Sequence, residues 1–160
     1  MTILPPYYEE QRFTQKWILV LQWLLLLLFA GIGFLLVYQQ KTGVLTAVIP
    51  FGLVCLIVVL FRIVRLQVEI CEDEIRYRFY PFHRRFRVIA KAEVSSISVR
   101  TYDPLGEYGG RGIRYGRKGM AYTITGNYGI GIITKTGKEI LLGTGQPGEV
   151  AEALKQHHWI

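Results

Sequence analysis

Three glycines near the C-terminal end have the spacing of a dinucleotide-binding loop. Gly143, Gly145 and Gly148 form a G-x-G-x-x-G pattern within LLGTGQPGEVAEAL, residues 141–154, between a strand-like EILL and a helix-like EVAEALKQ. In a dinucleotide fold this loop belongs to a parallel βαβ unit, with an acidic residue about 20 positions further on. Residues 149–160 offer one helix and no returning strand. We therefore interpret the glycines as a turn before a closing helix, and we expect no nucleotide cofactor.

The residue types that carry catalysis lack the surroundings that they need. A nucleophilic side chain requires a positioned base, and no G-x-S-x-G pattern surrounds the serines of residues 95–98. His157 and His158 are adjacent, so on a helix their side chains point about 100° apart and do not form a metal site. The acidic residues 72–74 are typical of a solvated turn. We expect no catalytic residue, no metal and no cofactor, and hence a non-enzymatic protein.

Cationic residues on a predicted hairpin are stronger candidates for binding a partner. This first group consists of Arg76, Arg78, Arg84, Arg85 and Arg87. The alternation of side chains along strands could place the arginines of both strands on one face. Like charges opposite each other destabilise a sheet, and a lipid phosphate or acidic residues of another chain would relieve this repulsion. Alternatively, the arginines are solvated or pair with Glu69 and Glu72.

A glycine-rich segment, DPLGEYGGRGIRYGRKG at residues 103–119, combines cations with tyrosines. We predict a loop or irregular hairpin, and this second group of candidate contact residues consists of Tyr108, Arg111, Arg114, Tyr115 and Arg117. Tyrosine and arginine are frequent anchors of protein interfaces, so we expect this segment to contact a protein. Aromatic and basic residues also alternate in nucleic-acid-binding proteins, but a membrane-tethered domain argues against that class. The alternative is a hairpin whose tyrosines pack on the domain.

Two apolar runs must position these residues at a membrane. WILVLQWLLLLLFAGIGFLLVY covers residues 17–38, VLTAVIPFGLVCLIVVLF covers residues 44–61, and QQKTG separates them. Twenty-two helical residues span roughly 33 Å, the thickness of a bilayer's hydrocarbon core. The first run is too long for a cleaved signal peptide, and no cleavage site follows it. The sequence predicts a transmembrane helical hairpin with helices at about 17–38 and 44–64.

The flanking charges predict how this hairpin is oriented. Arg12 and Lys16 precede the first run, Arg62 and Arg65 follow the second, and only Lys41 lies between the runs. Because cytoplasmic flanks are enriched in cations, we expect a multi-pass protein of the cell (inner) membrane with both termini in the cytoplasm. The net charge of +7 favours attraction to anionic lipid, although the positive-inside bias alone would also explain it.

Beyond residue 65 the sequence changes to the alternating pattern of half-buried strands. LQVEI, IRYRFY, RRFRVI and EVSSISV are followed by AYTIT, YGIGIIT and KEILLG, with GN and KTGK turns that favour hairpins and an antiparallel sheet. A helix is predicted from Pro147 to about His157. The predicted organisation is a polar, disordered lead at 1–16, a helical hairpin at 17–65 and a cytoplasmic domain at 66–160.

Several of these segments together resemble a known family. YRFYPFHRRFRVIAKAEVSSISV, DPLGEYGGRGIRYGRKGMAYTITGNYGIGI and EILLGTGQPGEVAEAL look like the small bacterial membrane proteins that carry a pleckstrin-homology-like (PH-like) domain. The resemblance covers about residues 17–158 and is most specific at 106–154. It implies an α+β fold: a two-helix transmembrane hairpin, then a PH-like antiparallel β-barrel or sandwich of about seven strands with a C-terminal capping helix. Since fold does not fix function, no ligand-binding residue is carried over.

Two functions stay open from the sequence. The first is a scaffold for protein interaction or self-assembly at the cytoplasmic membrane face, whose partner is another membrane protein or a second copy of this chain. The second is a reader of anionic lipid headgroups through the first arginine group. Nucleic acid is not expected as a partner.

Overall fold

The computed structural model describes residues 6–13, 15–39, 44–116 and 119–160. The chain forms two compact units: a helical unit, Phe13–Val64, and a sheet unit made of the residues up to Arg12 together with Arg65–Ile160. The helical unit is therefore inserted in the sequence between two parts of the sheet unit.

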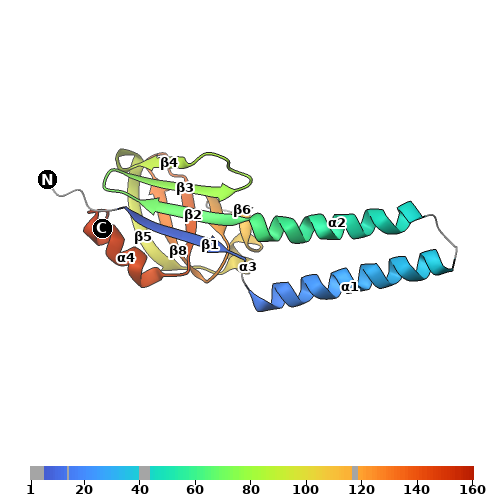
Figure 1. The fold of residues 1–160 in the computed structure, drawn as a ribbon. Coiled ribbons are helices and arrows are strands. Elements are labelled where there is room, and N and C mark those ends of the chain that lie inside the picture. The colour runs from blue at the N-terminus through green and yellow to red at the C-terminus, as the bar shows by residue number, and fades with distance from the viewer. Residues whose placement is uncertain (1–5, 14, 40–43, 117–118) are drawn as a thin grey trace. The chain divides into compact units, whose positions relative to one another are not determined.

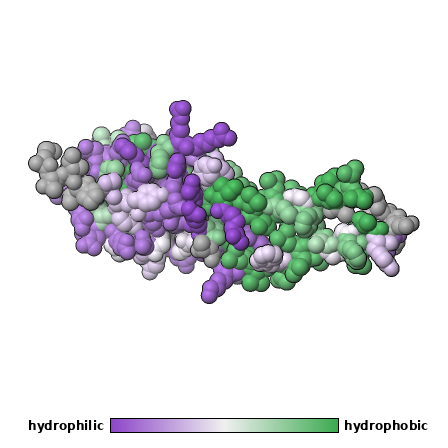
Figure 2. Space-filling model, viewed as in Figure 1, coloured by the Kyte–Doolittle hydropathy of each residue, from purple (hydrophilic) through white to green (hydrophobic). Residues whose placement is uncertain are grey.

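The helical unit consists of α1 (Lys16–Tyr38) and α2 (Val44–Ile63), which lie side by side (Figure 1). Ile18 and Gln22 are the buried residues of α1, and most other apolar side chains of both helices are exposed, which gives the helices a largely apolar surface (Figure 2). In the described part of the chain, one helix, α1, is long and apolar enough to cross a membrane by length and composition.

The first sheet of the sheet unit is antiparallel and has the strand order β1-β2-β3-β4. Its strands are β1 (Tyr7–Arg12), β2 (Arg65–Ile70), β3 (Glu74–Tyr80) and β4 (Arg87–Ala90). The predicted disordered lead at 1–16 is therefore wrong for residues 7–12. These residues form an edge strand that pairs with β2 from Tyr7↔Ile70 to Arg12↔Arg65.

The second sheet has the order β5-β8-β9-β7-β6. Its strands are β5 (Val94–Thr101), β6 (Gly112–Tyr115), β7 (Gly119–Thr123), β8 (Tyr128–Thr134) and β9 (Glu139–Thr144). The predicted hairpin at the GN turn is wrong, because β9 lies between β7 and β8 and pairs with β7 in parallel. Gly119 permits this pairing, since an added Cβ would collide with the carbonyl of Glu139.

Two helices and a 3-10 turn complete the sheet unit: α3 (Pro104–Tyr108), α4 (Pro147–Gln156) and the turn Lys91–Glu93. The C-terminal helix was predicted from Pro147 to about His157, and α4 confirms it. Val150, Ala153 and Leu154 form its buried stripe, the i, i+3, i+4 spacing of an amphipathic helix. The helix lies beside β5 (Figure 1).

The observed architecture is α+β with two sheets, and the sheets are not closed into a barrel in the residues described. The described residues form nine strands, where about seven were predicted. The apolar core follows the alternation read from the sequence: the fully buried side chains include Leu66, Val68, Ile70, Ile75, Phe79, Ile130, Ile132, Leu141 and Leu142. Burying a side chain of this kind contributes roughly 1.5–3 kcal/mol, so this core holds the two sheets together.

Candidate functional site

The glycine-rich turn between β9 and α4 is occupied by the protein's own carboxylate. Glu9, on β1, is 7% exposed and accepts hydrogen bonds from Gly145 N at 2.8 Å, Thr144 Oγ1 at 2.7 Å and Gln11 Nε2 at 2.9 Å. Gln11 Nε2 also donates to the carbonyl of Gly143 at 2.7 Å. A backbone N–H of this turn thus donates to an anion, as in a phosphate loop, but the anion is Glu9. No parallel βαβ unit follows the turn in the described residues.

The first arginine group does not share one face of the sheet. In the β3–β4 register, Arg87 lies opposite Tyr77, and Arg76 lies opposite Val88. Tyr77 is buried, so Arg87 faces the interior side, and its Nη1 donates to the hydroxyl of Tyr122 at 3.2 Å. The prediction that the arginines of both strands line one face is wrong, because that prediction assumed a register shifted by one residue.

Arg76 and Arg78 have partners within the first sheet. Arg76 pairs with Glu74, and Arg78 donates to Gln67 while its guanidinium lies 4.4 Å from the ring centroid of Phe86. Both side chains are therefore held by neighbours on the outer face of the sheet. They are less available to a partner than the sequence suggested.

The β3–β4 loop, residues 81–86, carries the most accessible part of the first group. Arg84 and Arg85 are exposed and have no hydrogen bond or ion pair with the residues that the structure describes. Phe82 beside them is 61% exposed. The loop therefore presents one aromatic ring and two cations that have no partner among the described residues.

The loop leaves the first sheet at a defined end. In the strand register, Arg12 of β1 lies opposite Arg65 of β2, and Arg65 lies opposite Tyr80 of β3. The three residues therefore form one row across these strands. The loop begins directly after Tyr80. Arg12 and Arg65 flank the helical unit in the sequence, so the loop and the two chain connections to the helices lie at the same end of this sheet.

Tyr108 of the second group is part of the packed structure. It is buried, its ring packs on Tyr102 at a centroid distance of 6.2 Å, and its hydroxyl accepts from Arg100 at 3.1 Å. For this residue the alternative, a tyrosine packed on the domain, is the observed one.

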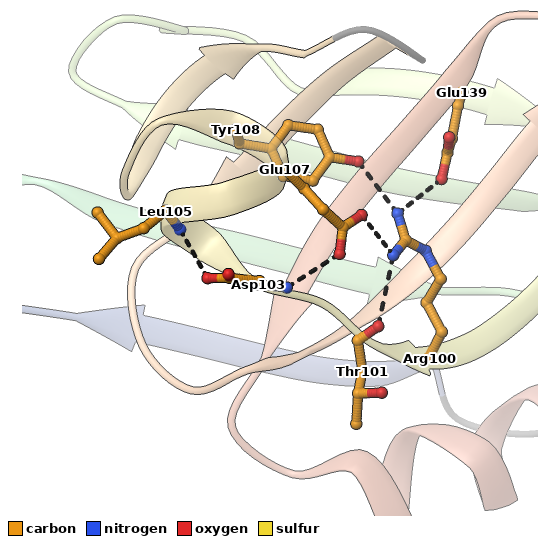
Figure 3. A network of polar contacts seen from close by, with 7 residues as sticks. All are labelled: Arg100, Thr101, Asp103, Leu105, Glu107, Tyr108 and Glu139. Carbon is orange, nitrogen blue, oxygen red and sulfur yellow. Dashed lines mark hydrogen bonds and ion pairs between the residues drawn. The ribbon is translucent and has the colours of Figure 1, made fainter.

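Arg100 on β5 is the centre of the polar network that holds α3 (Figure 3). Its guanidinium donates to Glu107 of α3 and to Glu139 of β9, both at 2.9 Å. Burial by itself lowers the pKa of Arg100, but the bonds to the two carboxylates outweigh it and raise the pKa overall. Asp103 caps α3 by accepting from Leu105 N at 3.0 Å. Within the described residues 103–116, this segment thus forms the helix α3 and the strand β6 rather than an open loop.

The remaining residues of the second group lie on or beside the edge strand β6. Arg111 donates to the carbonyl of Gly126 at 3.1 Å, and Arg114 donates to the carbonyl of Arg111 at 3.2 Å. Tyr115 is 83% exposed. Arg117 lies outside the described residues. Arg87 of the first group and Tyr115 of the second are brought together across the two groups, since both line one cavity.

Sequence reasoning missed Glu9, Phe82 and Arg100. Glu9 and Gln11 form a buried face that is polar, so the apolar alternation that reveals a strand is absent from β1. The start of α3 did carry a signal, because Asp103 followed by Pro104 is a typical helix N-terminus. Among the described residues, no group of three or more His, Cys, Asp or Glu is placed to hold a metal ion.

Comparison of the chain with models of known protein families gave no match. Comparison with curated proteins gave no match either.

Proposed function

We propose that this protein is a non-enzymatic, PH-like domain anchored in a bacterial inner membrane by α1 and α2, and that its β3–β4 loop contacts anionic lipid headgroups. The observation that carries the proposal is the exposed Phe82, Arg84 and Arg85, at the end of the sheet where the chain connects to the helices.

The exposed apolar surface of both helices supports membrane anchorage. Residues exposed by more than half on these helices include Leu27, Phe34, Leu45, Ile49 and Leu56. Each such side chain left in water forgoes roughly 1.5–3 kcal/mol of burial free energy, and lipid removes that penalty. A soluble core helix would be largely buried, whereas α1 is not. The flanking cations favour cytoplasmic termini: Arg12 precedes α1 and Lys16 is its first residue, while Arg62 lies in the last turn of α2 and Arg65 follows that helix.

The chemistry of the loop suits an anionic membrane surface. A cation near such a surface gains about 1 kcal/mol, and both Arg84 and Arg85 are free of competing partners among the described residues. Phe82 supplies an apolar side chain that lipid would cover. The two-sheet architecture with a closing helix α4 is compatible with the PH-like family that the sequence resembles.

The test compares the full chain in nanodiscs of phosphatidylcholine with the chain in nanodiscs that also contain phosphatidylserine. Hydrogen exchange of the peptide covering residues 81–86 should slow in the anionic discs, and the slowing should fade at high salt. The double variant Arg84→Gln/Arg85→Gln should lose it, whereas Lys135→Gln, an exposed cation on the β8–β9 turn, should retain it. Equal exchange in both kinds of disc would contradict the proposal.

A second candidate function is protein contact through β6. This strand is an edge of the second sheet and presents Arg114 and the exposed ring of Tyr115. An edge strand can accept a strand from another chain, either another membrane protein or a second copy. A photo-crosslinking residue at position 115, compared with position 128 on β8, tests it in native membranes. A product specific to position 115 supports a partner, and its mass separates a homo-oligomer from another protein; no product at position 115 would contradict this function.

A further inference from the structure

A cavity of about 350 Å³ opens on the sheet unit, lined by residues of β3, β4, β6, β7, β9 and the β8–β9 turn. Its floor is formed by Tyr77 of β3 and Tyr122 of β7, whose ring centroids are 5.0 Å apart. Arg87 of β4 forms one side, and Tyr115 and Met120 border it from the β6–β7 hairpin. The volume lies in the range of small-molecule sites in proteins, roughly 300–1,000 Å³.

The β8–β9 turn supplies the opposite side of the cavity. Thr134, Thr136, Gly137 and Lys138 all line it. The hydroxyls of Thr134 and Thr136 are 2.9 Å apart, and Thr134 Oγ1 also donates to the carbonyl of Lys138 at 3.0 Å. These bonds fix the turn, so Lys138 is presented from an ordered structure.

The charge of the cavity favours an anion. Arg87 uses one N–H in its bond to Tyr122, and the rest of its five donors and the ammonium of Lys138 have no hydrogen-bonded carboxylate among the described residues. Glu139 also lines the cavity, but its carboxylate is paired with Arg100 at 2.9 Å. Among the described residues that line the cavity, the cations Arg87 and Lys138 thus face one carboxylate, Glu139, which Arg100 already neutralises.

The hydroxyls and apolar side chains add a second kind of contact. Burial, together with the neighbouring Tyr122, raises the pKa of Tyr77 to about 12, so its hydroxyl is a neutral hydrogen-bonding group at physiological pH. Met120, Ile140 and the exposed ring of Tyr115 are apolar surfaces on the wall and rim. A planar apolar body would contact these side chains while an anionic group reaches the cations.

We propose that this cavity binds a small organic anion, a phosphate or carboxylate attached to a planar apolar group, with the anion held between Arg87 and Lys138 and the apolar group against Tyr115 and Met120. This site is separate from the β3–β4 loop, so the inference does not depend on lipid contact by that loop.

The test uses the full chain in nanodiscs of phosphatidylcholine and isothermal titration with three probes: phenyl phosphate, inorganic phosphate and phenol. We expect saturable binding of phenyl phosphate, about tenfold weaker binding of inorganic phosphate, and no saturable binding of phenol, because charge-assisted bonds carry most of the affinity. Lys138→Gln and Arg87→Gln should each weaken phenyl phosphate binding by about tenfold or more.

Matched variants separate this site from general attraction to a basic protein. Lys135→Gln removes an exposed cation on the same turn that does not line the cavity, and it should leave the affinity unchanged. Tyr115→Ala alters an exposed side chain and should weaken phenyl phosphate but not inorganic phosphate. No saturable binding, or equal losses in Lys135→Gln and Lys138→Gln, would overturn the proposal.

The source of the anion is decided by repeating the titration in nanodiscs that contain phosphatidylserine. An unchanged affinity for phenyl phosphate supports a soluble small molecule as the occupant. A lower affinity for phenyl phosphate in the phosphatidylserine discs than in the phosphatidylcholine discs, absent in the Lys138→Gln variant, also supports an anion site. In that case a lipid headgroup enters the site as well.

Discussion

Replacement of Glu9 by alanine is the most direct test of how β1 is held. The carboxylate accepts four hydrogen bonds, three short ones from Thr144, Gly145 and Gln11 and a longer one of 3.5 Å from the Tyr7 hydroxyl, and none of its partners is a cation. A hydrogen bond to a charged group contributes about 1.5–3 kcal/mol, and a buried donor left without an acceptor costs about 1–3 kcal/mol. These terms do not add, and the variant also avoids the cost of burying a charge. We expect a net loss of about 2–4 kcal/mol in the free energy of unfolding of β1.

The assay is hydrogen exchange of the peptide covering residues 7–12, measured on the full chain in mild detergent. A loss of about 2–4 kcal/mol corresponds to roughly 30- to 1,000-fold faster exchange. Arg12→Ala is the matched control, because Arg12 lies on the same strand, its side chain is 53% exposed, and it pairs with Glu10 at 2.6 Å. Exposed pairs contribute about 0–1 kcal/mol. Equal exchange rates in the two variants would refute the role assigned to Glu9.

Three further predictions follow from the sheet unit. Replacing Phe13–Val64 by Asn-Gly should give a soluble, folded protein, because β1 and β2 pair directly and a two-residue turn can join them. Residues 65–160 alone, which lack β1, should unfold at a lower temperature than this variant. Equal melting temperatures of the two proteins would contradict the prediction. Arg100→Gln should lower the free energy of unfolding by about 1–3 kcal/mol, and an unchanged urea midpoint would contradict the role of the network in Figure 3. Burial and the nearby Arg87 lower the pKa of His83 in the folded chain. As the pH falls, His83 of the unfolded chain therefore takes up its proton at a higher pH than His83 of the folded chain. Stability should therefore fall as the pH drops below about 6.5, and His83→Asn should flatten the melting temperature between about pH 5 and pH 7; equal slopes would argue against it.

Much of the local structure could be predicted because its signal is local. The continuous apolar runs predict α1 and α2, the alternation in LQVEI and IRYRFY predicts β2 and β3, and Pro147 with the spaced apolar residues Val150 and Leu154 predicts α4. For α1 and α2 the signal is the length of the apolar run, and for β2, β3 and α4 it is a period of 2 or 3.6 residues in the apolar side chains. The face on which Leu66 and Val68 lie follows from that period alone.

The candidate sites could not be predicted in the same way, because they depend on which strands pair and in what register. A register shift of one residue moves a side chain to the other face, and this decides that Arg87 reaches Tyr122 while Arg76 pairs with Glu74. The parallel pairing of β7 with β9 brings Tyr115 and Lys138 to one cavity.

The amino-acid sequence by itself determined that this protein has two apolar helices, a strand-rich basic part and a C-terminal amphipathic helix, since these follow from periodicity and composition. Only the tertiary structure decided that β1 pairs with β2 across the inserted helices, and that Glu9 fills the glycine-rich turn. Glu9 and Gly145 are far apart in the sequence, and their contact depends on packing between sheets. No local pattern of residues records such a contact.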